Sequence, residues 1–165
     1  MYKRALIPLD GSPVGETILP FILEIAGPLD MDVVLLRVVH PVPPIVIEGS
    51  RHVVIEDVSA RRVDAEEYLA PLAVELRGKG VRVETQVRRG SPAAEILAAA
   101  REVEADLIAM TTHGRSGLGR LMFGSVAEEV LRHSDIPVFL MRATEVQVET
   151  RRASRDRERR AGGPR

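Results

Sequence analysis

Short apolar runs alternate along the chain with segments whose apolar residues recur at helical spacing. The short runs predict strands at 4–9, 32–39, 81–87, 106–112 and 136–142. The intervening segments predict helices: one stopped by Gly27-Pro28, one over 61–77, one opened by Ser91-Pro92 and one following Gly124. Strands that alternate with helices predict a parallel sheet with right-handed crossovers.

The apolar pattern of each strand also predicts its place in the sheet. Residues 81–87 alternate apolar and polar positions, which indicates an edge strand, whereas the other runs are nearly continuous. This favours the spatial order 3-2-1-4-5, with strands numbered along the chain. The winding then reverses between strands 1 and 4, and a crevice opens at their carboxyl ends. We therefore predict an α/β fold of three layers (α/β/α) around a five-stranded parallel sheet.

Two stretches break the pattern. Residues 40–57 are irregular and rich in proline, as functional or mobile loops often are. Residues 150–165 hold seven arginines against Asp156 and Glu158, a charge of +5, which leaves −6 for the rest of the chain. We predict a folded domain over 1–143 and a disordered basic tail over 144–165. The mildly acidic body predicts no nucleic-acid binding, and a solubilising tail is favoured over one that binds acidic partners.

Composition excludes several classes of protein. The 165 residues fit one domain, and 45% hydrophobic with 3% aromatic residues implies an aliphatic core. The absence of cysteine excludes disulfides, zinc–thiolate sites and thiol catalysis. The first apolar run ends at Pro8 and Asp10, too early for a signal peptide, and no run reaches the ~18 residues of a membrane span. We predict a cytoplasmic protein that does not enter membranes.

A glycine-rich loop follows the fourth strand and runs into a helix. Its glycines permit positive φ, so that backbone N–H groups can converge on an anion; they are Gly114, Gly117 and Gly119. Gly124 and Ser125 then begin a helix, whose N-terminus favours phosphate, and Arg115 and Arg120 add charge. The alternative is a flexible loop in which Ser125 and Glu128 form a capping box.

Two better-known phosphate motifs are absent. No G-x4-G-K-[ST] sequence occurs, and the glycines follow strand 4 rather than strand 1, with spacing that is not G-x-G-x2-G. His113 has no carboxylate or nucleophile at hydrolase-type spacing, so we interpret it as a loop hydrogen-bonding residue rather than a catalytic one. The remaining histidines have no metal-site spacing.

Residues 2–142 resemble the universal stress protein family in its single-domain form. ATP-binding members carry G-x2-G-x9-G-[ST], which is matched here by Gly114, Gly124 and Ser125. Thr111 stands where the first glycine would be. The whole stretch from His113 to Arg142 is typical of the family. The resemblance implies an adenine nucleotide α-hydrolase-like fold that binds ATP, with or without Mg²⁺.

The resemblance also implies roles for individual residues. Pro8, Leu9 and Asp10 would line the nucleoside, Val38 would contact adenine, and Met110 and Thr111 would form the floor. The phosphates would be held by Gly114, Gly124, Ser125, Val126 and Ala127, with Arg115 and Gly117 of the loop beside them. Asp10 is also a weak candidate for a magnesium ligand through Mg-ATP. Against these roles, Pro8, Val38 and Met110 could be core, and Asp10 a turn residue.

Three functions follow, from different classes. The first is a dimeric, ATP-binding regulatory module of the stress response, paired through the apolar edge strand 136–142, as is common in the family. The second is a nucleotide-free interaction protein, which Thr111 would favour. The third is a weak ATPase, although Asp10-Gly11-Ser12-Pro13 lacks the SGGxDS-type loop of related ATP pyrophosphatases.

Overall fold

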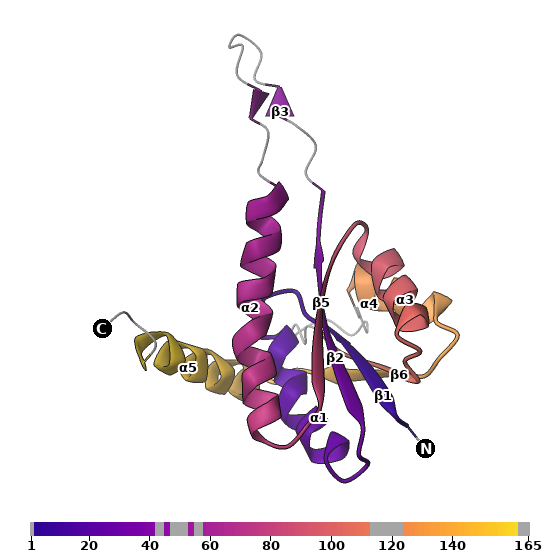
Figure 1. Ribbon diagram of the computed structural model, residues 1–165, viewed down its shortest axis with the longest axis vertical. Coiled ribbons are helices and arrows are strands. Elements are labelled where there is room, and N and C mark those ends of the chain that lie inside the picture. Colours follow the sequence, from indigo (N-terminus) through magenta and orange to yellow (C-terminus); the bar gives the residue numbers. More distant parts are fainter. Residues whose placement is uncertain (1, 42–44, 47–52, 55–57, 113–123, 162–165) are drawn as a thin grey trace.

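A computed structural model describes residues 2–41, 45–46, 53–54, 58–112 and 124–161 (Figure 1). Its main sheet has five parallel strands in the order β5-β2-β1-β6-β7. Their bounds are β1 Arg4–Pro8, β2 Asp32–Val39, β5 Val83–Arg89, β6 Leu107–Thr112 and β7 Val138–Arg142. The predicted strands and their order 3-2-1-4-5 are confirmed.

Helices cover both faces of this sheet, as predicted (Figure 1). One face carries the short 3-10 helix η1 (Gly15–Thr17) with α1 (Ile18–Ala26) and α2 (Val58–Gly78). The other carries α3 (Pro92–Glu102) and α4 (Ser125–His133). Side chains within one strand alternate between the two cores: Ala5 and Ile7 pack under α1 and α2, whereas Leu6 packs under α3 and α4. Both faces of the sheet are therefore buried, which explains why most of its strands are continuous apolar runs in the sequence.

The core is aliphatic, with one aromatic contact near its margin. Leu6, Ile7, Leu35 and Ile108 are fully buried on the central strands. Each such side chain contributes about 1.5–3 kcal/mol of burial free energy. Phe21 of α1 stacks on Phe139 of β7, with ring centroids 4.5 Å apart. This contact packs the edge strand β7 against α1, the helix that follows β1.

Two segments differ from the sequence-based expectation. The irregular stretch 40–57 contains a short antiparallel pair, β3 (Ile45–Val46) with β4 (Val53–Val54), which lies beyond the start of α2 in Figure 1. The prediction of a disordered tail is wrong for Glu145–Ala161, which form helix α5. Arginine, glutamate and alanine are good helix formers, and α5 has charged partners on the domain. The charge count alone revealed neither this helix-forming tendency nor the partners of α5.

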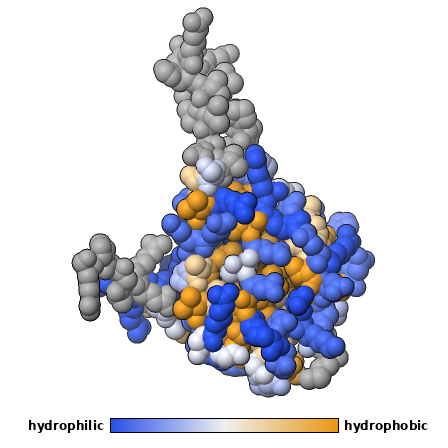
Figure 2. Space-filling model, in the orientation of Figure 1, coloured by the Kyte–Doolittle hydropathy of each residue, from blue (hydrophilic) through white to orange (hydrophobic). Residues whose placement is uncertain are grey.

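Figure 2 shows hydrophilic side chains over much of one face, with apolar side chains between them. Among the described residues, no helix is long and apolar enough to cross a membrane.

Candidate functional site

A cavity of about 730 Å³ opens at the carboxyl ends of β1, β2 and β6, where the winding reverses. This is the position predicted for a ligand crevice. The predicted site residues that line it are Pro8, Leu9, Asp10, Val38, Met110, Thr111, Gly124, Ser125, Val126 and Ala127. Gly114, Arg115 and Gly117, with the rest of 113–123, lie outside the described residues. Every predicted site residue that the structure describes therefore lines one cavity.

The turn after β1 is closed by Asp10. Its Oδ1 accepts hydrogen bonds from the Ser12 backbone N–H at 2.9 Å and from Ser12 Oγ at 2.6 Å. A Cβ at Gly15 would lie only 2.7 Å from the same oxygen, so the close approach of η1 requires glycine there. Asp10 is thus a turn residue, which the sequence analysis gave as the alternative to a role in binding. Its exposed side chain still lines the cavity, and its Oδ2 has no partner among the described residues.

The end of β6 supplies the floor of the cavity. Met110 is buried in the core beneath α3 and α4, while part of it faces the cavity. Thr111 Oγ1 lies 3.4 Å from both the Gly15 carbonyl oxygen and Thr17 Oγ1. These contacts are at the long end of hydrogen-bond distances. The hydroxyl is therefore directed toward η1, while Thr111 itself still lines the cavity.

The N-terminus of α4 meets the cavity at Gly124 and Ser125. Gly124 is the N-cap, with φ +83°, a conformation that side chains rarely adopt. No side chain caps this helix, and Ser125 is its first residue. The capping box of Ser125 with Glu128 is therefore not formed. Within the described part of the chain, the first backbone N–H groups of α4 have no side-chain partner, and N–H groups of this kind bind anions.

Sequence reasoning missed a wall of the cavity made by β2 and α2. Arg37, Arg61, Asp64 and Tyr68 line it as well. Arg37 interrupts the apolar run of β2, and such a charge was a signal of function in the sequence. The residues on α2 carried no signal, because a mixed-charge helix is normally a solvated face. Their role follows only from how α2 crosses the strand ends.

Tyr68 is the most perturbed titratable group at this wall. Its hydroxyl donates to Glu16 Oε1 at 3.0 Å. The guanidinium carbons of Arg37 and Arg155 lie 5.7 and 5.6 Å from its ring centroid, within the range of cation–π attraction. Burial raises the pKa of Tyr68 strongly, and the Glu16 charge raises it further. The phenol is thus held neutral, as a hydrogen-bond donor, beside the cavity.

The chain is similar to proteins of one family over residues 1–142. The model of the universal stress protein family matches residues 1–142. Universal stress protein MJ0531 of Methanocaldococcus jannaschii is 34% identical over 144 residues, which cover 86% of this chain and 83% of that protein. The chain belongs to the universal stress protein family. The resemblance that rested on Gly114, Gly124 and Ser125 is thereby confirmed.

Solved structures of this family share the fold. The M. jannaschii protein MJ0577, solved to assign its biochemical function, superposes with a TM-score of 0.68 at 25% identity, covering 88% of this chain and 99% of that one. A universal stress protein in complex with cAMP gives 0.64 at 19% identity (87% and 98% covered). One from Archaeoglobus fulgidus in complex with dAMP gives 0.59 at 22% (84% and 97% covered). The fold of this universal stress protein is adenine nucleotide α-hydrolase-like.

Metal-binding geometry is not preformed in the described part of the protein. No group of three or more His, Asp or Glu side chains gathers there.

The raised pKa of Tyr68 predicts an alkaline limit to stability. In a Tyr2→Phe variant Tyr68 is the only tyrosine, and we expect phenolate absorbance to appear only as the protein unfolds. An unfolded tyrosine ionises near pH ~10, whereas folded Tyr68 keeps its proton. The contribution of Tyr68 to the free energy of unfolding should therefore be constant below that pH and fall above it. Circular dichroism should report unfolding in step with the absorbance; a phenolate formed in the folded protein near pH ~10 would contradict the assignment.

Proposed function

We propose that this universal stress protein binds an adenine nucleotide, ATP above all, in the cavity at the ends of β1, β2 and β6. The carrying observation is that the described site residues, from four separate elements, line this one cavity. Its volume of about 730 Å³ lies in the usual range for small-molecule sites. The cAMP and dAMP complexes of structurally similar universal stress proteins support the choice of ligand class.

Each end of the cavity suits one part of a nucleotide. Val38 and Met110 offer apolar surface to a base, and Asp10 offers a carboxylate oxygen to a ribose hydroxyl. The uncapped N-terminus of α4 offers backbone N–H groups to phosphate at Gly124, Ser125 and beyond. We propose that Gly114, Arg115 and Gly117 complete this phosphate site, with Val126 and Ala127 behind it. Asp10 would contact Mg²⁺ only through Mg-ATP.

The proposed role is regulatory rather than catalytic. Asp10 Oδ1 is already engaged by Ser12, and Tyr68 at the pocket wall is held neutral as a hydrogen-bond donor. Slow hydrolysis or none is expected from such a site. The bound nucleotide would then change the conformation of the protein. This conformation would signal the nucleotide concentration to a stress response in the cytoplasm.

The second candidate is a nucleotide-free interaction protein of the same family, and Thr111 is the observation that favours it. Its side chain lines the cavity where ATP-binding relatives have glycine. Against it, the Thr111 hydroxyl is directed toward Gly15 and Thr17. We therefore favour the nucleotide-binding function.

A charge placed at the α4 N-terminus should separate ATP binding from folding. ATP at 100 times its Kd should stabilise the wild-type protein by ~2.7 kcal/mol in thermal unfolding. Ser125→Asp should weaken ATP binding at least about fivefold, since like charges ~4 Å apart repel by ~1 to 4 kcal/mol. The same carboxylate suits a helix N-terminus, so stability without ATP should not fall. Ser125→Ala is the matched neutral control; no thermal shift of the wild type at millimolar ATP would remove the proposal.

Replacing Thr111 tests the second candidate. Because the Thr111 hydroxyl is directed toward η1, Thr111→Gly should change the Kd for ATP by less than about threefold, under ~0.7 kcal/mol. Isothermal titration of both proteins measures this. A wild type that fails to bind while Thr111→Gly binds would establish the nucleotide-free function instead.

We also propose a homodimer, paired through the edge strand β7. This strand has β6 as its neighbour on one side and no strand on the other in the described sheet, and its apolar side chains are only half-buried. Light scattering should give twice the chain mass of 18.1 kDa. Val138→Lys should reduce the mass, because lysine on an edge opposes strand pairing. Val74→Lys, on the exposed face of α2, should not. A wild-type monomer at micromolar concentration would contradict the dimer.

A further inference from the structure

Glu16 is a buried carboxylate beside the nucleotide cavity. It lies in η1 and is 0% exposed. A buried charge is tolerated only when it is paired and hydrogen-bonded. Arg151 Nε donates to its Oε2 at 2.7 Å, and Arg155 Nη1 lies 3.0 Å from its Oε1. Both cations come from α5, which lies outside the family match over residues 1–142.

Arg151 joins α5 to two elements at once. Besides Glu16 on η1, its Nη2 donates to Glu75 Oε2 on α2 at 3.0 Å, and the arginine is only 8% exposed. Apolar contact is limited, since Val146 of α5 is 72% exposed and Val148 is only half-buried. Figure 1 shows α5 extending away from the rest of the domain. The arginine–carboxylate contacts are therefore what holds α5 in place.

Arg155 extends this docking to the wall of the cavity. Its Nη1 donates to the Gly11 carbonyl oxygen at 3.1 Å, and its guanidinium lies over the Tyr68 ring. Gly11 and Tyr68 both line the cavity, and Gly11 follows Asp10 directly. One side chain of α5 thus contacts the turn after β1 and the wall from α2.

We propose that α5 acts as a latch, by which we mean a helix that Arg151 and Arg155 hold against the domain. Within it, Arg155 is a positioning residue for the nucleotide site. Docked on Glu16, Arg155 fixes the Gly11 carbonyl and the Tyr68 ring in the arrangement that accepts the ligand. The proposal rests on the proposed function. Nucleotide binding and α5 docking then favour each other, and by linkage the effect must be reciprocal.

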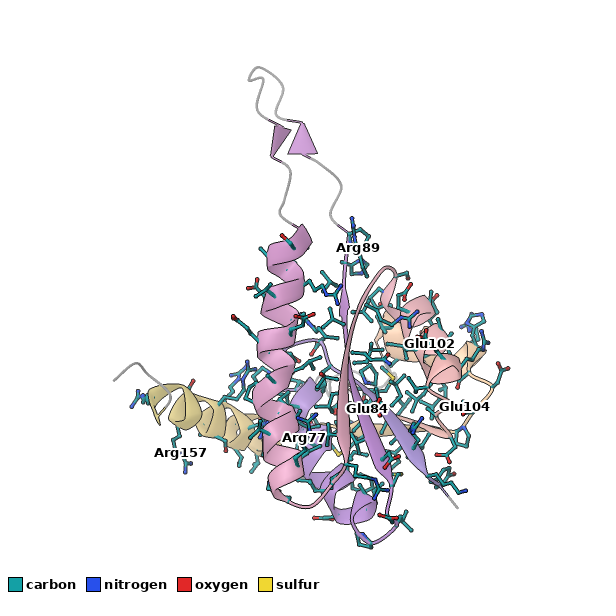
Figure 3. All side chains as sticks on the ribbon, in the orientation of Figure 1. Arg77, Glu84, Arg89, Glu102, Glu104 and Arg157 are labelled. Atoms are coloured by element: carbon teal, nitrogen blue, oxygen red, sulfur yellow. The ribbon has the colours of Figure 1, made fainter. Side chains whose placement is uncertain are left out.

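The forward effect is measured by isothermal titration of ATP into the full-length protein. Arg155→Gln should raise the Kd about fivefold or more, the low end of typical coupling between sites. Glu16→Gln removes the anchor from the opposite side of the same contact and should raise the Kd in the same direction. Arg157→Gln is the matched control, because Arg157 is exposed on the same helix and directed away from the domain (Figure 3). Its Kd should equal that of the wild type.

The reverse effect is measured by hydrogen exchange of α5 amides, in the wild type with and without ATP. Exchange should slow when ATP is bound, and this slowing should shrink in Arg155→Gln. A merely structural role for the arginine would not make α5 respond to ligand. The wild-type measurement also stands if a variant folds poorly.

The outcomes separate the two proposals. A wild type that does not bind ATP overturns the proposed function and the coupling together. A wild type that binds ATP, with equal Kd values for Arg155→Gln and Arg157→Gln and an α5 exchange rate indifferent to ATP, overturns the latch alone.

Discussion

The parallel pairing of β1 with both β2 and β6 is the constraint on which the rest of the structure depends. Leu6 and Ile7 sit at its centre, and each faces a different helical layer. The right-handed crossovers run in one direction from β1 to β2 to β5 and in the opposite direction from β5 to β6 to β7, so α1 and α2 are forced to one face and α3 and α4 to the other. No crossover can then cover the carboxyl ends between the two halves. The cavity is a consequence of the topology, and the sequence places Asp10 and Thr111 at its rim.

This origin explains which features could be predicted. Strand order follows from apolar patterning, because a strand dry on both faces reads as a continuous run and 81–87 does not. Residues at strand ends, such as Asp10, Val38 and Met110, follow from the order. Residues brought in by a neighbouring helix do not, since nothing in the pattern of α2 says that Tyr68 faces the strand ends. Arg37 falls between these two cases. Its charge stands out in an apolar strand of the sequence, but the sequence does not predict what it contacts.

Helix α5 was missed for a different physical reason. A run of arginines has low hydropathy, and low hydropathy with high charge predicts disorder when no partner is considered. The partner is Glu16, which is 135 positions earlier in the chain than Arg151. In the sequence Glu16 is one acidic residue at the start of a helix, with nothing to mark it as buried. Ion pairing at such separation appears only when the fold has placed both charges.

The charges at the cavity wall connect the topology of the sheet with the docking of α5. Glu16 and Glu75 are matched by Arg151 and Arg155, which leaves Arg37 without a carboxylate partner among the described residues. Its Nη1 donates to the Leu9 carbonyl oxygen at 3.2 Å, and its guanidinium lies over the neutral Tyr68 ring. Neither contact neutralises the Arg37 guanidinium, which lies at the cavity together with the carboxylates of Asp10 and Asp64. A guanidinium in a partly dry crevice attracts anions, and the α4 N-terminus adds to it from the other side. An acidic protein thus brings a guanidinium and a helix N-terminus to the same cavity, at the place where its sheet cannot be closed.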